Sequence, residues 1–126
     1  MTPAKPTSIF RVGADKRTES LEVDDERLKA LAREVRKGEG DILEFKAKAN
    51  HPDKIARSLI SFANGKGGSL LLGIGDDGEF RGVRYPEEDV AAIARILRAA
   101  NPRLKWKYEI VALSAKKWLV VFIVFE

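Results

Sequence analysis

Residues 67–78 read GGSLLLGIGDDG, and this stretch decides the fold because an apolar run leads directly into a glycine-rich turn. Its second half, GIGDDG, matches the G-x-G-x-x-G pattern of dinucleotide-binding turns, which requires a helix that opens on the third glycine. Residues 79–83 instead alternate in character and contain another glycine, so we expect no helix there. An Asp-Gly pair between apolar segments is a strong hairpin signal. The stretch therefore predicts a strand over 69–75, a turn, and a short strand over 79–83.

The rest of the chain alternates between helical and extended patterns. Apolar residues recur at helical spacing, with start and stop signals at the ends, over 25–37, 52–64 and 86–99. Strand patterns occupy 41–48, 104–110 and 118–125, and the last of these is almost continuously apolar. We therefore expect an α+β fold, in which a mixed sheet of about five to six strands packs with two to three helices.

The composition limits the class of protein. With 126 residues, 44% of them hydrophobic and 33% charged, the chain is predicted to form one soluble domain over 23–126 after a flexible arm over 1–22. The absence of cysteine excludes disulfides and cysteine-bound zinc, and it fits a cytoplasmic protein. No apolar run approaches the roughly 18 residues of a membrane-spanning helix. The chain ends directly after an apolar strand, which is compatible both with a natural end and with a fragment of a longer protein.

Basic residues are concentrated in one part of the chain. The segment from Arg95 to Lys117 contains seven basic residues and one acid, within a chain of formal net charge +4. This excess is compatible with a polyanion such as nucleic acid, and equally with an ordinary solvated face. Trp106 and Tyr108 alternate with lysines in this segment, which predicts that both aromatic rings pack in the core.

The loop GKGGS at 65–69 has the composition of a phosphate-binding loop but the wrong surroundings. A P-loop follows a strand and opens a helix, whose N-terminal amides hold the phosphates. Here the glycines end a predicted helix and lead into a strand. We therefore expect that this loop does not bind ATP. The most that we expect of Lys66 is a contact with the phosphate backbone of a nucleic acid.

Two carboxylates and a lysine lie close together in the sequence at 39–46. Glu44 and Lys46 share one face of the predicted strand, and Glu39 lies in the turn before it. Metal-dependent nucleases use Glu-x-Lys in this way: the acid holds Mg²⁺ and the lysine stabilises the phosphate. A charged strand face produces the same tripeptide, so a third acid near the Asp-Asp-Gly turn is needed to favour the catalytic interpretation.

The order of several short motifs resembles that of the Schlafen/AlbA-type domain. The motifs are E-x-x-x-x-E-F-K at 39–46, SFAN at 61–64, GGSLLLGIGDDG at 67–78 and Gly-Val at 82–83, and the similarity runs from about Leu28 to the C-terminus. The resemblance implies a mixed α/β fold related to the chromatin protein AlbA and a DNA-binding role in bacterial regulators. It also implies pairing of two such domains, which predicts a homodimer in which the long apolar last strand is a covered sheet edge. Animal Schlafens carry this domain as an RNA endonuclease that cuts tRNA and rRNA through three metal-binding acids.

The resemblance also implies which residues would act in a nuclease. Glu39 and Glu44 match the first two acids, but the third follows the apolar strand as the Asp of a G-[VI]-D segment, where this chain has Gly75. Asp76 comes one position later, and in a turn it could substitute. The nuclease alternative thus has Glu39, Glu44, Lys46 and Asp76 as catalytic residues, with Mg²⁺ or Mn²⁺ held by Glu39, Glu44 and Asp76.

The departure at Gly75 places nucleic-acid binding first, the metal-dependent endoribonuclease second, and an ATP-responsive or protein-binding regulatory module third. In the first hypothesis the chain needs no cofactor and contacts the backbone phosphates of DNA or RNA. The cations expected to make these contacts are Lys46, Lys48, Lys66, Arg103, Lys105 and Lys107.

Overall fold

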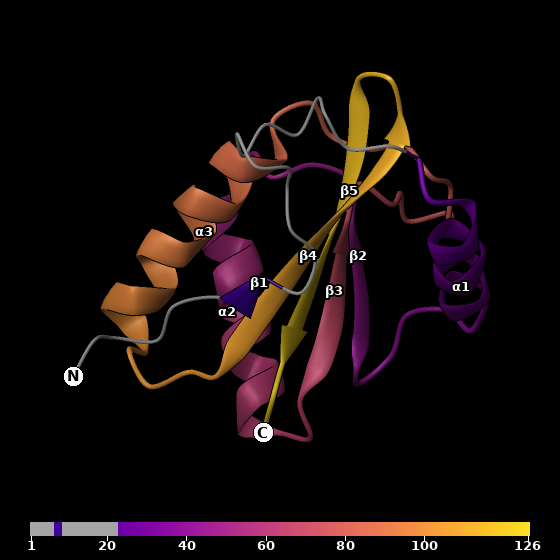
Figure 1. Cartoon of the computed structure of the whole chain (residues 1–126). Helices are drawn as coiled ribbons and strands as arrows, with labels where there is room; N and C mark the ends of the chain where they lie inside the picture. Colours follow the sequence, from indigo (N-terminus) through magenta and orange to yellow (C-terminus); the bar gives the residue numbers. More distant parts are fainter. Residues whose placement is uncertain (1–6, 9–22) are drawn as a thin grey trace.

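A computed structural model describes residues 7–8 and 23–126. Apart from the two residues of β1, the predicted arm over 1–22 lies outside the described residues. Within these limits the chain forms one five-stranded sheet and three helices, so the predicted α+β class is confirmed (Figure 1). The strands are β1 (Thr7–Ser8), β2 (Leu43–Lys46), β3 (Gly68–Leu72), β4 (Trp106–Ser114) and β5 (Lys117–Val124). The helices are α1 (Asp25–Arg36), α2 (Pro52–Asn64) and α3 (Pro86–Ala100).

The sheet is mixed, with the strand order β1-β4-β5-β3-β2. The outer pairs β1–β4 and β2–β3 are parallel, whereas β5 runs antiparallel to both of its neighbours, β3 and β4. The β4–β5 hairpin is confirmed, because Ser114 pairs with Lys117 across a tight turn. None of the described helices combines the length and the apolar character that a bilayer crossing requires.

Two layers of helix cover the two faces of the sheet. On one face lie α2 and α3, which both begin with a proline at the first helical position and run in the same direction (Figure 1). Their fully buried residues, such as Leu59 and Ile93, pack on Leu70 and Phe122. On the other face α1 packs Leu31 against a second apolar cluster of the sheet.

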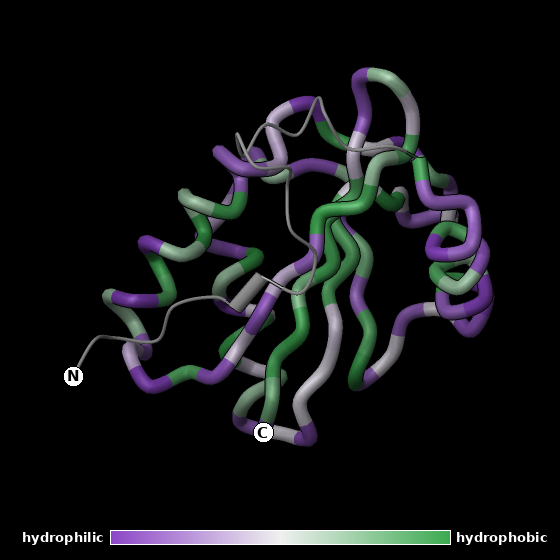
Figure 2. The backbone as a smooth tube through the Cα atoms, in the orientation of Figure 1, coloured by the Kyte–Doolittle hydropathy of each residue, from purple (hydrophilic) through white to green (hydrophobic). Residues whose placement is uncertain are grey.

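The last strand lies in the middle of the sheet, and the expectation that it forms a covered edge is wrong. β5 has hydrogen-bonded neighbours on both sides and helices over both faces. A strand buried in this way reads as a continuous apolar run, which explains its sequence and its green colour in Figure 2.

The predicted strand over 79–83 is also wrong, since the described residues form only isolated bridges there, Ile74 with Phe80 and Val83 with Trp118. The backbone has positive φ at Gly73 (100°) and Gly82 (74°), which bends the segment out of an extended ladder. The carbonyl of Gly73 accepts the amides of both residue 81 and residue 82, each at 2.8 Å. The predicted turn is confirmed, with the amide of Gly78 bonded to the carbonyl of Gly75.

A charged pair connects α1 to the sheet. Arg27 Nε donates to Glu109 Oε2 at 2.7 Å, and Arg27 Nη2 donates to the other carboxylate oxygen. Glu109 is only 6% exposed, and its hydrogen bond raises the pKa of Arg27 above the ordinary value. The single acid of the basic segment 95–117 is therefore an internal partner of α1.

Candidate nucleic-acid interface

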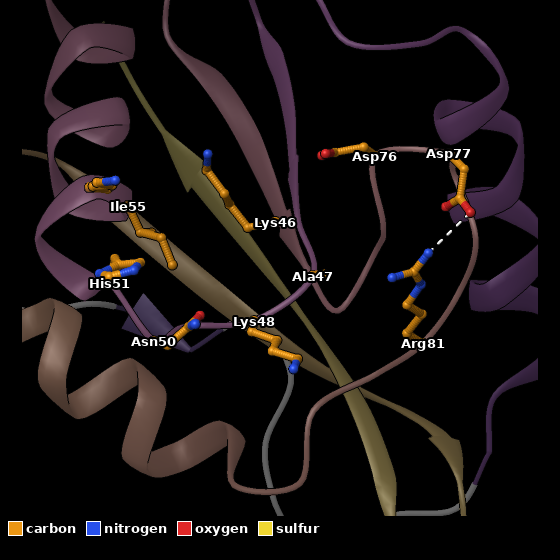
Figure 3. A pocket seen from close by; sticks show the side chains of 10 residues that line it. Lys46, Ala47, Lys48, Asn50, His51, Ile55, Asp76, Asp77 and Arg81 are labelled. Atoms are coloured by element: carbon orange, nitrogen blue, oxygen red, sulfur yellow. Dashed lines mark hydrogen bonds and ion pairs between the residues drawn. The ribbon is translucent and has the colours of Figure 1, made fainter.

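A cavity of about 540 Å³ opens at the carboxyl end of β2 (Figure 3). Because β2 and β3 are parallel, the segments that follow them emerge at the same edge of the sheet, where α/β proteins commonly place their ligands. Three segments line the cavity: the end of β2, the first turn of α2 and the loop after β3. Their polar side chains include Lys46, Lys48, His51, Lys54, Asp76 and Arg81.

The charges of the cavity are separated in space. Figure 3 shows Lys46, Lys48 and His51 on the side of β2 and α2, with Asp76 and Asp77 on the opposite side. Lys54, in the first turn of α2, adds a further cation to the lining. The cavity therefore has a basic wall and an acidic wall, and Arg81 lies on the acidic wall beside Asp77.

Some of these charges already have partners. Lys46 Nζ lies 3.1 Å from Glu44 Oε2, and Arg81 Nη2 lies 3.1 Å from Asp77 Oδ2. Lys48 and Lys54 are exposed and have no ion-pair partner among residues 7–8 and 23–126. These two ammonium groups are available to an anionic ligand.

The loop after β3 is held by its own side chains. Asp77 Oδ1 accepts the amide of Glu79 at 3.0 Å, and this hydrogen bond, followed by the nearby Arg81, lowers the pKa of Asp77. A Cβ at Gly75 would lie 2.7 Å from Asp77 Oδ1 and 2.8 Å from Arg81 Cζ. Gly75 therefore leaves room for the ion pair between Asp77 and Arg81.

The three predicted metal-binding acids have different surroundings. Glu39 Oε2 accepts the backbone amide of Phe45 at 2.8 Å and so closes the turn before β2. Glu44 accepts a hydrogen bond from Ser58 of α2, at 3.0 Å, in addition to its pair with Lys46. Asp76 lines the cavity, whereas the other two acids do not.

In this arrangement the acids do not fit a magnesium ion, which needs near-octahedral oxygen ligands at about 2.0–2.1 Å. Within the part of the chain that the structure describes, no group of three or more His, Asp or Glu side chains is placed to hold a metal. The assignment of Mg²⁺ or Mn²⁺ to Glu39, Glu44 and Asp76 stays a prediction.

The predicted cations lie at two ends of the sheet. Lys46 and Lys48 line the cavity. Lys66 lies in the turn between α2 and β3. The remaining three lie just before β4 or at its start: Arg103, Lys105 and Lys107. Gly68 at the start of β3 and Trp106 at the start of β4 are both paired with Val124 of β5, so these two strands begin at the same end of the sheet. Four residues of β3 separate this end from the cavity, or about 13 Å at 3.3 Å per residue. We call the four cations at this end the far group: Lys66, Arg103, Lys105 and Lys107.

The far group is in part tied to the C-terminal strand. Lys107 Nζ lies 5.4 Å from the centroid of the Phe125 ring, and the carbonyl of Lys105 accepts the amide of Phe125. The loop at 65–69 ends α2 and enters β3 as expected, and a Cβ at Gly67 would lie 2.6 Å from the carbonyl oxygen of Val124. The predicted core position of Trp106 is confirmed, because its side chain is buried and stacked on Phe122.

Sequence reasoning missed Lys54 and Arg81 as members of the site. Lys54 falls within the predicted helix over 52–64, and Arg81 falls within the predicted strand over 79–83. Their common signal is position: each lies shortly after a strand that ends at the same sheet edge. That signal is usable only when β2 and β3 are known to be parallel neighbours.

The family model described as Schlafen, AlbA_2 matches residues 39–126. The match covers more than half of the chain and includes all three segments that line the cavity. It does not include α1. No curated protein matches the chain in sequence.

Proposed function

This chain belongs to the Schlafen AlbA_2 family, and from this premise we propose that it binds nucleic acid, with the cavity as the principal phosphate contact. One observation carries the proposal. Lys48 and Lys54, both exposed and without ion-pair partners among the described residues, lie on the basic wall of a cavity at the carboxyl ends of two parallel strands. Phosphates of a nucleic-acid backbone are the anions that such a wall binds with little dependence on sequence.

The paired cations can contribute to the same contact. Lys46 and Arg81 are held only by partly exposed ion pairs, which are worth about 0–1 kcal/mol each. An approaching phosphate can therefore compete with Glu44 and Asp77 for them. Asp76 repels a phosphate from the acidic wall, so the backbone is expected to follow the side of β2 and α2.

The far group is proposed as a second contact. It lies about 13 Å from the cavity along β3, so only a strand long enough to span the sheet reaches both. A regulator role and a homodimer belong to the same proposal. Light scattering of the purified chain tests the dimer directly.

The endonuclease alternative would require Glu39, Glu44 and Asp76 to come together around one metal ion, whereas Glu39 is bonded to the Phe45 amide, Glu44 to the Ser58 hydroxyl, and only Asp76 lines the cavity. No described contact favours that rearrangement, so nucleic-acid binding without cleavage is the function that the geometry supports best.

The test is a fluorescence-anisotropy titration of a labelled 20-mer, single-stranded and duplex, at several salt concentrations. The Lys48→Ala/Lys54→Ala variant is expected to bind more weakly, with a slope of log K against log salt that is shallower by about 1.4 on single strands or about 1.8 on duplex DNA. Lys29→Ala, which removes an exposed lysine of α1, is the matched control and is expected to keep the slope. Absence of binding by the unaltered protein at low salt, or an unchanged slope in the double variant, would overturn the proposal.

A further inference from the structure

Tyr85 is the most exposed large hydrophobic residue among those described, with 63% of its surface accessible. It precedes α3 as the N-cap residue, but its side chain makes no capping hydrogen bond to the helix. Its neighbour Arg84 is exposed as well. Neither core packing nor helix capping therefore accounts for an aromatic ring at this position.

The backbone around Tyr85 is held on both sides. The amide of Val83 donates to the carbonyl of Trp118 at 2.7 Å, and the amide of Trp118 donates back to Val83 at 2.9 Å. After Tyr85, Pro86 is buried and the carbonyl of Tyr85 accepts the amide of Asp89. The exposed ring is thus carried by an anchored segment, and little conformational entropy is lost when a ligand packs on it.

Tyr85 lies at the same end of the sheet as the cavity. Arg81 lines the cavity, and Tyr85 follows it four positions later, so their Cα atoms are at most about 14 Å apart. Figure 1 shows that α2 and α3 both begin at this end, which places the start of α3 beside the helix whose first turn forms the basic wall. An exposed aromatic ring next to a basic cavity is the combination by which proteins hold unpaired nucleotides.

We propose that Tyr85 stacks on an unpaired base of a strand whose phosphates contact the cavity, so that the domain prefers single-stranded segments of DNA or RNA over duplex. The inference rests on the proposed function and extends it to the form of nucleic acid. In a duplex both faces of each base are already covered by neighbouring bases, so the ring has no face to contact. In a single strand a base can turn onto the ring without breaking a pair.

The experiment compares Tyr85→Ala and Tyr85→Phe with the unaltered protein on labelled 12-mers: single-stranded DNA, single-stranded RNA and a duplex of the same sequence. Tyr85→Ala is expected to lower affinity for the single strands by about 5- to 150-fold, the effect of losing one stacked base. The salt slope is expected to stay unchanged, because an uncharged ring releases no counterions. Tyr85→Phe keeps the ring and is expected to retain the affinity. Comparison of the two single strands decides whether the sugar matters.

Lys29→Ala is the control, since Lys29 is an exposed residue of α1 outside both the cavity lining and the far group, and it is expected to keep the affinity for the single strands. Equal losses on single strands and duplex in Tyr85→Ala, no loss at all, or an equal loss in Tyr85→Phe would overturn the stacking role while leaving nucleic-acid binding in place. Failure of the unaltered protein to bind any of the three oligonucleotides would instead overturn the proposed function, and the inference with it.

Discussion

The pair between Arg27 and Glu109 allows a stability prediction whose size follows from burial. Replacing Arg27 by leucine leaves the Glu109 carboxylate, with 9% of its side chain exposed, without its two donors. Breaking a buried ion pair from one side costs about 3–5 kcal/mol. The Arg27 side chain is 31% exposed, so water can reach part of the site, and we expect a loss at or below the lower end, about 2–3 kcal/mol.

Urea unfolding of the single and double variants measures this loss. In Arg27→Leu/Glu109→Leu the carboxylate is also removed, and we expect the free energy of unfolding to return to within about 1 kcal/mol of the unaltered protein. Lys29→Ala, on the same helix but in an exposed pair, is expected to change it by less than about 0.5 kcal/mol. A single variant as stable as the unaltered protein, or a double variant as unstable as the single one, would refute the reasoning.

Three further predictions concern glycine, pH and catalysis. Gly67→Ala is expected to destabilise the fold by about 1–3 kcal/mol in thermal unfolding, because its φ is +80° and the new Cβ would overlap a backbone carbonyl of β5. Gly40→Ala, with nothing within 4 Å, is the control, and equal losses in the two would contradict the overlap argument. Partial burial, and then a neighbouring glutamate, raise the pKa of Asp89, so the folded protein binds this proton more tightly than the unfolded chain does. The stability from this proton is lost as pH rises from about 4 through the raised pKa. In urea unfolding, Asp89→Asn should therefore gain stability relative to the unaltered protein as pH rises through this range. A constant difference would show that ionisation of this group is not the cause. With tRNA and Mn²⁺ we expect little or no cleavage on gels by the unaltered protein or by Gly75→Asp, because Glu39 and Glu44 do not line the cavity and a side chain at position 75 would overlap the pair of Asp77 and Arg81. Rapid cutting that disappears in Glu44→Ala would reverse the ranking of binding over catalysis.

Local signals in the sequence were sufficient for the helices and for one strand of the site. Pro52 at the start of α2 and the Asn-Gly stop after it act within a few residues of the chain, so they predict the helix without knowledge of its neighbours. The alternation of Leu43 and Phe45 with charged residues likewise predicts which face of β2 is buried. The order of motifs at 39–83 was specific enough to indicate the family that the match over 39–126 shows.

What the sequence determined is therefore the local conformation, the buried faces and the family, because each depends on residues close together in the chain. Only the tertiary structure decided that β5 is central, since a continuous apolar run does not say which strands pair with it. It also decided which residues form the candidate site: the cavity brings together Lys48, Lys54 and Arg81 because β2 and β3 pair in parallel. Strand pairing depends on residues far apart in the chain, because it is decided by which strands can be buried together on both faces. The glycines with positive φ after β3 then turn the loop that follows this strand back toward the edge of the sheet where the cavity lies.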